Sequence, residues 1–229
     1  MNNLYFWYIL FGIAPSIIWL LIFLRKDSHP ESNRMILKIF LYGILAALPA
    51  AFIEVGIDKL PLGEILYFLV GVALVEEVFK YLVVKKKVVG NPEFDEPVDA
   101  MLYMIIAALG FAAAENVLNM FLLSKPQYFL ETFLTGGVRF IGATFLHALC
   151  SGLVGYYLAL SFLYTKKRLK LVTQGLFSAI LLHGLYDLSI IKIEGDIKFI
   201  IPIIILIFLA IFISFGFQKV KKLKSICRT

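Results

Sequence analysis

Polar side chains, most of them ionisable, occur inside four long apolar stretches of this sequence, where charged groups are rare. They are Glu76, Glu77 and Lys80 in the stretch 62–84, Glu115, Asn116 and Asn119 in 100–123, His147 and Ser151 in 137–164, and His183 and Asp187 in 171–191. A charge at the centre of a membrane span costs about 2.5–3.5 kcal/mol on insertion scales. Side chains this costly usually face one another or a cavity, and carboxylates beside imidazoles can activate a water molecule and transfer its protons.

The spacing of these residues predicts that they converge. His183 and Asp187 are four residues apart, so they share one helix face and the carboxylate can orient the imidazole. Glu76 and Lys80 have the same spacing and can form an ion pair. With a rise of about 1.5 Å per residue, the four stretches bring their polar residues to one level, slightly outward of the membrane midplane.

The elements that must position these residues are membrane spans. The 229-residue chain is 61% hydrophobic and 17% charged, with a mean hydropathy of +0.89. Apolar runs of about 20 residues can cross a bilayer as helices and are too long for barrel strands. We therefore predict an all-α, polytopic membrane helix bundle that forms a single domain over residues 1–229. Seven spans fit the apolar runs, at roughly 4–24, 37–57, 62–84, 100–123, 137–164, 171–191 and 199–217.

The basic residues predict how the chain is oriented. Sixteen Lys and Arg residues fall in one alternating set of loops and the C-terminal tail, against four in the opposite loops. Because positively charged loops stay in the cytoplasm, we predict an external N-terminus and a cytoplasmic C-terminus. The net charge of +6 comes mainly from these flanking residues. It indicates contact with anionic lipid headgroups rather than with nucleic acid.

The loop at 90–99 is acidic although it is predicted to be cytoplasmic. It contains Asp95, Glu96 and Asp99 around Pro97. This pattern is typical of a helix start, because proline suits the first turn and carboxylates suit the positive end of the helix dipole. A role in gating or in substrate contact is the alternative.

Five short motifs occur in order between about residues 70 and 190. They are Glu76-Glu77-x-x-Lys80, Phe94-Asp95-Glu96-x-x-Asp99, Gly110-Phe111-x-x-x-Glu115-Asn116, His147-Ala148-x-x-x-Gly152 and His183-Gly184-x-Tyr186-Asp187. In this set the chain resembles the PrsW family, bacterial membrane proteases that begin the processing of an anti-sigma factor and are related to the CAAX prenyl endopeptidases. The resemblance implies an intramembrane peptidase of the bacterial plasma membrane. Its expected substrate is a single-pass membrane protein that is cut near its extracytoplasmic boundary.

The resemblance also implies roles for the polar residues. A buried glutamate, Glu76 or Glu77 with Glu76 favoured, is expected to act as general base on a water molecule. His147 is expected to polarise the carbonyl or hold the water. His183, oriented by Asp187, is expected to act as oxyanion donor or proton shuttle. Structural alternatives are a salt bridge for the glutamates and an interhelical brace for His183. The supporting residues are Lys80, Glu115 and Asn116.

No cofactor is favoured, and zinc is the alternative. In the wider superfamily the second motif often ends in His, whereas this chain has Glu115, so the resemblance leaves a metal-free and a metal-dependent mechanism open. His147, His183 and Glu115 would form a sufficient ligand set together with a bound water. The sequence contains no His-Glu-x-x-His, so such a site would depend on the convergence of separate helices.

Other functions fit the sequence less well. Ser151 lacks the Gly-x-Ser-Gly context of an intramembrane serine protease, and only Asp187 is available for an aspartyl mechanism. Cys150 lies in an apolar span, where a thiol is usually inert, and it is not expected to pair with Cys227 in the basic tail. A proton-coupled transporter would use buried carboxylates and histidines, but it predicts internal repeats that we do not find. A non-catalytic protein that binds a partner's transmembrane helix is a third alternative.

Overall fold

The computed structural model describes residues 2–26, 29–123, 129–195 and 197–223. The described residues are almost entirely helical and contain no strand, which confirms the predicted all-α class. Cys227 lies outside them. The helices are α1 (Asn2–Leu24), α2 (Asn33–Ile57), α3 (Glu64–Leu66), η1 (Tyr67–Ala73), α4 (Leu74–Lys87), α5 (Pro97–Leu123), α6 (Phe129–Leu163), η3 (Thr165–Lys167), α7 (Arg168–Lys192) and α8 (Ile197–Val220).

Six of the described helices are long and apolar enough to cross a membrane: α1, α2, α5, α6, α7 and α8. The third predicted span corresponds to α3, η1 and α4, which follow one another without a break from residue 64 to residue 87. This segment contains a π-helical turn, Tyr67–Ala73, just before Glu76 and Glu77. The predicted fifth span starts at 137, but α6 begins at Phe129, because a helix can continue beyond its apolar portion.

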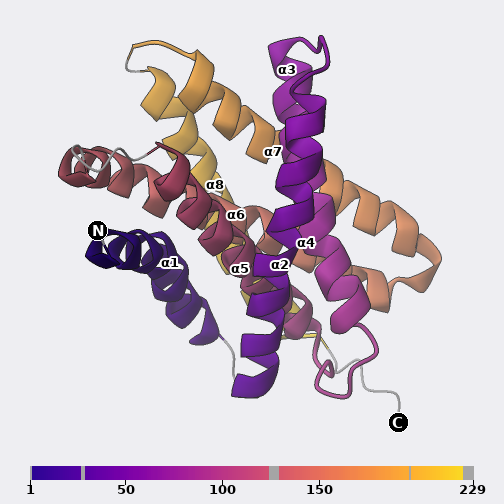
Figure 1. Cartoon of the computed structure of the whole chain (residues 1–229). Helices are drawn as coiled ribbons and strands as arrows, with labels where there is room; N and C mark the ends of the chain where they lie inside the picture. Colours follow the sequence, from indigo (N-terminus) through magenta and orange to yellow (C-terminus); the bar gives the residue numbers. More distant parts are fainter. Residues whose placement is uncertain (1, 27–28, 124–128, 196, 224–229) are drawn as a thin grey trace.

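Helix α5 lies at the centre of the bundle and packs against α1, α2, α4 and α6 (Figure 1). Nearly every side chain from Val98 to Ala113 is buried. Two glycines allow α2 and α5 to cross in backbone contact. A Cβ atom at Gly43 would overlap the carbonyl oxygen of Ala107, and one at Gly110 would overlap that of Phe40. Small residues at a helix crossing allow this close packing in membranes.

Helix α1 is tied to this core by Asn116 on α5. The Asn116 side-chain amide donates to the Gly12 carbonyl oxygen at 3.3 Å and to Thr144 Oγ1 on α6 at 2.9 Å. Pro15 interrupts the regular hydrogen bonding of α1 within the same turn. Asn116 therefore joins three helices beside Glu115.

The acidic loop before α5 contains the helix start that the sequence predicted. Helix α5 begins at Pro97, and Asp99 Oδ2 accepts the backbone N–H groups of Asp95 and Glu96 at 3.0 and 2.7 Å. Asp99 is the third residue of the helix, and its carboxylate accepts from the N–H groups of the two residues just before the helix, as the third-position side chain of a capping box does. The alternative roles in gating or substrate contact stay predictions.

Candidate active site

Helix α4 supplies two buried glutamates and the lysine that pairs with both. Lys80 Nζ lies 3.0 Å from Glu76 Oε2 and 2.9 Å from Glu77 Oε1. Its side chain is fully buried, and the ammonium group also lies 4.7 Å from the centre of the Phe111 ring. A buried charge requires such partners. The pattern Glu-Glu-x-x-Lys places all three groups on one side of a single helical turn.

Glu77 is held by contacts on both of its oxygens. Its Oε1 lies 3.0 Å from His183 Nδ1 as well as 2.9 Å from Lys80 Nζ, and its Oε2 accepts from Ser151 Oγ at 3.2 Å. The residue is completely buried and does not line the cavity described below. Glu77 therefore joins α4 to α6 and α7 as a structural centre.

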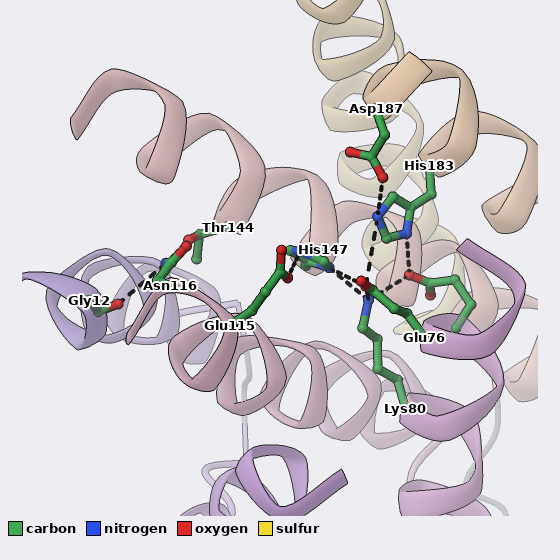
Figure 2. Close-up of polar contacts among 10 residues, drawn as sticks. Gly12, Glu76, Lys80, Glu115, Asn116, Thr144, His147, His183 and Asp187 are labelled. Carbon is green, nitrogen blue, oxygen red and sulfur yellow. Dashed lines mark hydrogen bonds and ion pairs between the residues drawn. The ribbon is translucent and has the colours of Figure 1, made fainter. Parts of the chain in front are cut away.

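Glu76 has a different setting, because its carboxylate faces the two histidines and the cavity. Its Oε2 lies 3.5 Å from His147 Nδ1 and 3.8 Å from His183 Nε2. Figure 2 shows Glu76 between the two imidazoles, with Lys80 on the side of α4. Helices α4, α6 and α7 thus present polar groups to one small volume, and α5 adds Glu115 beside His147, so the four stretches meet as the depth estimate predicted.

The partners of His147 determine its tautomer. Lys80 Nζ lies 2.7 Å from His147 Nδ1, and an ammonium group can only donate, so Nδ1 is the acceptor. His147 Nε2 then carries the hydrogen, and this nitrogen lies 2.9 Å from Glu115 Oε2. Glu115 therefore orients His147 from the side opposite to Glu76 (Figure 2).

His183 faces carboxylates through both of its ring nitrogens. Nδ1 contacts Glu77, and Nε2 lies 3.3 Å from Asp187 Oδ2, the partner predicted from the i,i+4 spacing. Carboxylate oxygens only accept, so this setting suits a ring with hydrogen on both nitrogens, the form that can donate a proton. The rings of His183 and His147 lie edge to face with their centres 4.9 Å apart.

A cavity of about 540 Å³ connects this cluster to the side of the bundle that is predicted to be extracytoplasmic. Glu76, His147 and His183 lie along it, whereas Asp58, Glu64 and Lys192 belong to the helix ends at its mouth. Glu64 and Lys192 form an ion pair of 2.6 Å. The cavity gives water and a peptide segment a route to groups that lie at membrane depth.

The cavity residues also include a set that could hold a metal ion. One ligand atom each from Glu76, His147 and His183 lies within 4.8 Å of the others. Two imidazoles and one carboxylate match the protein ligands of catalytic zinc sites, which leave a position for water. The residues therefore fit a zinc ion. In this structure the Lys80 ammonium group contacts two of the three, Glu76 and His147.

The sequence predicted a ligand set of His147, His183 and Glu115. The structure places Glu76, not Glu115, beside the two histidines. Glu115 contacts the outer nitrogen of His147, and Glu76 lies where Glu115 was expected. The depth of a residue follows from its position in a span, but the direction of its side chain depends on the rotation of the helix. Glu115 and Glu77 lie at the ring nitrogens of His147 and His183 that face away from Glu76, so they are better placed to orient the two imidazoles from outside.

Two residues near the site were not identified as polar site residues by the sequence analysis. Glu54 on α2 has a buried Oε1 without a hydrogen-bond partner among the described residues, and its carboxyl group interacts electrostatically with Glu76 and Glu115. Asp58, one turn further along, lines the cavity mouth. The sequence signal for Glu54 is that it is the single acidic residue inside the apolar run 37–57.

The fold and the site together define a class of protein: a multi-pass helical membrane protein with a cluster of glutamates and histidines open to one side of the bilayer. Comparison with known sequences identifies the family. Residues 31–215 match the PrsW family, described as PrsW family intramembrane metalloprotease. The chain therefore belongs to the PrsW family of intramembrane proteases, and it is a multi-pass bacterial membrane protein.

The relatives cover most of the chain. Protease PrsW of Bacillus subtilis (strain 168) is 30% identical over 219 residues, which are 94% of this chain and 94% of that protein. Protease PrsW of Geobacillus kaustophilus (strain HTA426) is 33% identical over 182 residues, 77% of this chain and 76% of the relative. Protease PrsW of Clostridioides difficile (strain 630) is 29% identical over 208 residues, 87% and 85% of the two chains. No solved structure gives a significant match to this chain.

Proposed function

We propose that the chain is an intramembrane endopeptidase in which Glu76 is the general base, and that residues 1–229 form one protease domain. The observation that carries this proposal is the different setting of the two glutamates. Glu76 lines the cavity and faces both histidines, whereas the two oxygens of Glu77 are occupied by Lys80, His183 and Ser151. A general base must reach the water that it deprotonates.

The hydrolysis would use the cluster in a defined order. A water molecule beside Glu76 would lose a proton to the carboxylate as its oxygen attacks the peptide carbonyl. His183, with hydrogen on both nitrogens, would donate to the developing oxyanion or pass a proton to the leaving amine. His147 would hold the water or the carbonyl through hydrogen bonds. Lys80 and Glu77 would keep the carboxylate and the imidazoles in register.

A metal-dependent form of the same reaction is the second candidate, and the Glu76, His147 and His183 cluster supports it. These three residues would hold a zinc ion, with Glu115 and Glu77 orienting the imidazoles through the ring nitrogens on the outer side. When bound, zinc would lower the pKa of a coordinated water and polarise the substrate carbonyl.

The proposed substrate is a single-pass, membrane-anchored anti-sigma factor that is cut near its extracytoplasmic boundary, as in the first cleavage of a regulated series. The position of the cavity supports this proposal. Its mouth is formed by the ends of α2 and α7 and by Glu64, all on the side that the basic loops predict to be external. A peptide from that side could reach Glu76 without unfolding the bundle.

A cleavage assay on reconstituted protein tests the proposal. The wild type and the variants Glu76→Gln and Glu77→Gln would be incubated with a candidate single-pass anti-sigma factor, with and without chelator. We expect Glu76→Gln to stay folded and to lose about 10²–10⁴-fold in rate, and Glu77→Gln to lose stability as well. Glu64→Gln, at the cavity mouth, is the matched control and should retain most activity.

The outcomes separate the alternatives. Undiminished cleavage by Glu76→Gln would overturn its assignment as base. Loss of wild-type activity on chelation, restored by added zinc, would select the metal-dependent form, and an unchanged rate would favour the metal-free one. Absence of cleavage by wild type for a panel of single-pass substrates would contradict the endopeptidase proposal.

A further inference from the structure

A second concave site lies at the opposite membrane boundary from the active-site cavity and has no part in the proposed chemistry. It is a groove of about 460 Å³ between α4 and the turn that joins α6 to α7. Three basic side chains line it: Lys85 from the end of α4, Lys166 from the turn and Arg168 from the first residue of α7. In the sequence these residues belong to the positive-inside pattern.

The walls of the groove are apolar. Leu158 and Val172 are buried in its floor, and Tyr81 lies one turn before Lys85, with the ammonium group 5.7 Å from the ring centre. Leu169 lies at the edge with 78% of its surface exposed. The groove thus combines cations at the bilayer surface with apolar side chains that extend toward the hydrocarbon. An amphiphile with an anionic head and an apolar tail matches this combination.

Two further features favour an anion at this position. All three cations are exposed, and none forms an ion pair with a carboxylate in the described part of the chain. Helix α7 begins at Arg168 with no side-chain cap and no acidic residue in its first turn. The positive end of its dipole is therefore not neutralised by the protein and adds to the field of the three side chains.

We propose that this groove binds one anionic phospholipid, with the headgroup phosphate between Lys85, Lys166 and Arg168 and an acyl chain along Leu158 and Leu169. Basic pockets between transmembrane helices on the cytoplasmic side are suited to such headgroups. The bound lipid would connect the end of α4, the helix of Glu76 and Glu77, to the start of α7, the helix of His183. It would thus link two helices of the active site from the face opposite to the cavity.

Native mass spectrometry of the full-length, delipidated protein tests the proposal. Phosphatidylglycerol would be titrated against wild type, and phosphatidylcholine would serve as the neutral probe. The groove variant combines Lys85→Gln, Lys166→Gln and Arg168→Gln. The control variant removes three exposed charges from the same predicted side, outside the groove: Arg25→Gln, Lys26→Gln and Lys38→Gln.

We expect wild type to retain one phosphatidylglycerol in preference to phosphatidylcholine. The groove variant should bind it at least about 10-fold more weakly, because each Lys or Arg at the surface contributes several-fold to the attraction, and the control should change by less than about twofold. A charge-preserving variant, Lys85→Arg with Lys166→Arg and Arg168→Lys, should bind like wild type. Equal losses in the groove and control variants would overturn the proposal, as would displacement of the lipid by millimolar inorganic phosphate.

Discussion

At the scale of single residues, Lys80 is the charge that allows the glutamate pair to be buried. Its ammonium group contacts Glu76, Glu77 and His147 at 3.0, 2.9 and 2.7 Å. Removing one partner of a buried ionic network leaves the remaining charges without a counter-charge. The loss of stability is then far larger than the net stabilisation that the intact ion pairs provide. Lys80 therefore stabilises the folded site as well as taking part in its chemistry.

We expect Lys80→Met to lower the free energy of unfolding by about 3–5 kcal/mol, because two carboxylates lose their buried cation. Thermal unfolding in detergent would measure the change. Lys192→Met is the control, because within the described residues this half-exposed lysine pairs with the exposed Glu64 alone, and its loss should cost less than about 1 kcal/mol. Equal melting temperatures for the two variants would contradict the assigned role of Lys80.

The contacts of Ser151 indicate a structural hydroxyl rather than a nucleophile. It donates to Glu77 at 3.2 Å and lies away from the cavity lining. We therefore expect Ser151→Ala to cost about 1 kcal/mol of stability and to change the cleavage rate by no more than a few-fold. If Ser151 were the nucleophile, this variant would lose nearly all activity. Its cleavage rate therefore distinguishes a structural serine from a catalytic one.

At the scale of helices, the π-helical turn η1 positions α4 against α7. Gly184 follows His183 directly and packs on η1, where an added Cβ would lie 2.6 Å from Leu69 Cδ2 and 3.1 Å from the Phe68 carbonyl oxygen. The Leu69 side chain can turn away, but the Phe68 carbonyl oxygen belongs to the backbone, so η1 and α7 would also have to move apart by a few tenths of an ångström. The 3.0 Å contact between His183 and Glu77 depends on the close approach.

We expect Gly184→Ala to lower the cleavage rate by about 10-fold, since a displacement of about 1 Å in a catalytic group can cost about 10²-fold and the backbone contact here requires a smaller shift. Gly56→Ala on α2 is the matched control, because a Cβ there would meet nothing within 4 Å. Rates would be compared at equal amounts of folded protein. Wild-type activity in Gly184→Ala would show that the contact between η1 and α7 does not set the geometry of the site.

The helices were predictable from the sequence, whereas their rotations were not. Apolar runs and basic flanks gave the spans, and the depth of Glu76, His147 and His183 followed from counting residues. The exchange of roles between Glu115 and Glu76 depends on side-chain direction, which packing decides. The π-helical turn also has no local signal in the sequence, yet it shifts the direction in which the following glutamates point.

At the scale of the whole molecule, the two concave sites open at opposite membrane boundaries. The active-site cavity reaches the helix ends at Asp58 and Lys192, and the basic groove lies at Lys85 and Arg168. The positive-inside pattern assigns the groove to the cytoplasm and the cavity to the exterior. This arrangement fits an enzyme that receives its substrate from outside while its inner surface contacts anionic lipid.

The orientation can be tested by cysteine labelling in intact cells. In a Cys227→Ser background, a membrane-impermeant maleimide should modify Lys59→Cys, in the exposed turn after α2. It should modify Lys167→Cys, in the turn before α7, only after the membrane is permeabilised. Native Cys150 is completely buried and should not react. The reverse labelling pattern would place the cavity on the cytoplasmic side, and the substrate would then have to be cut at its inner boundary.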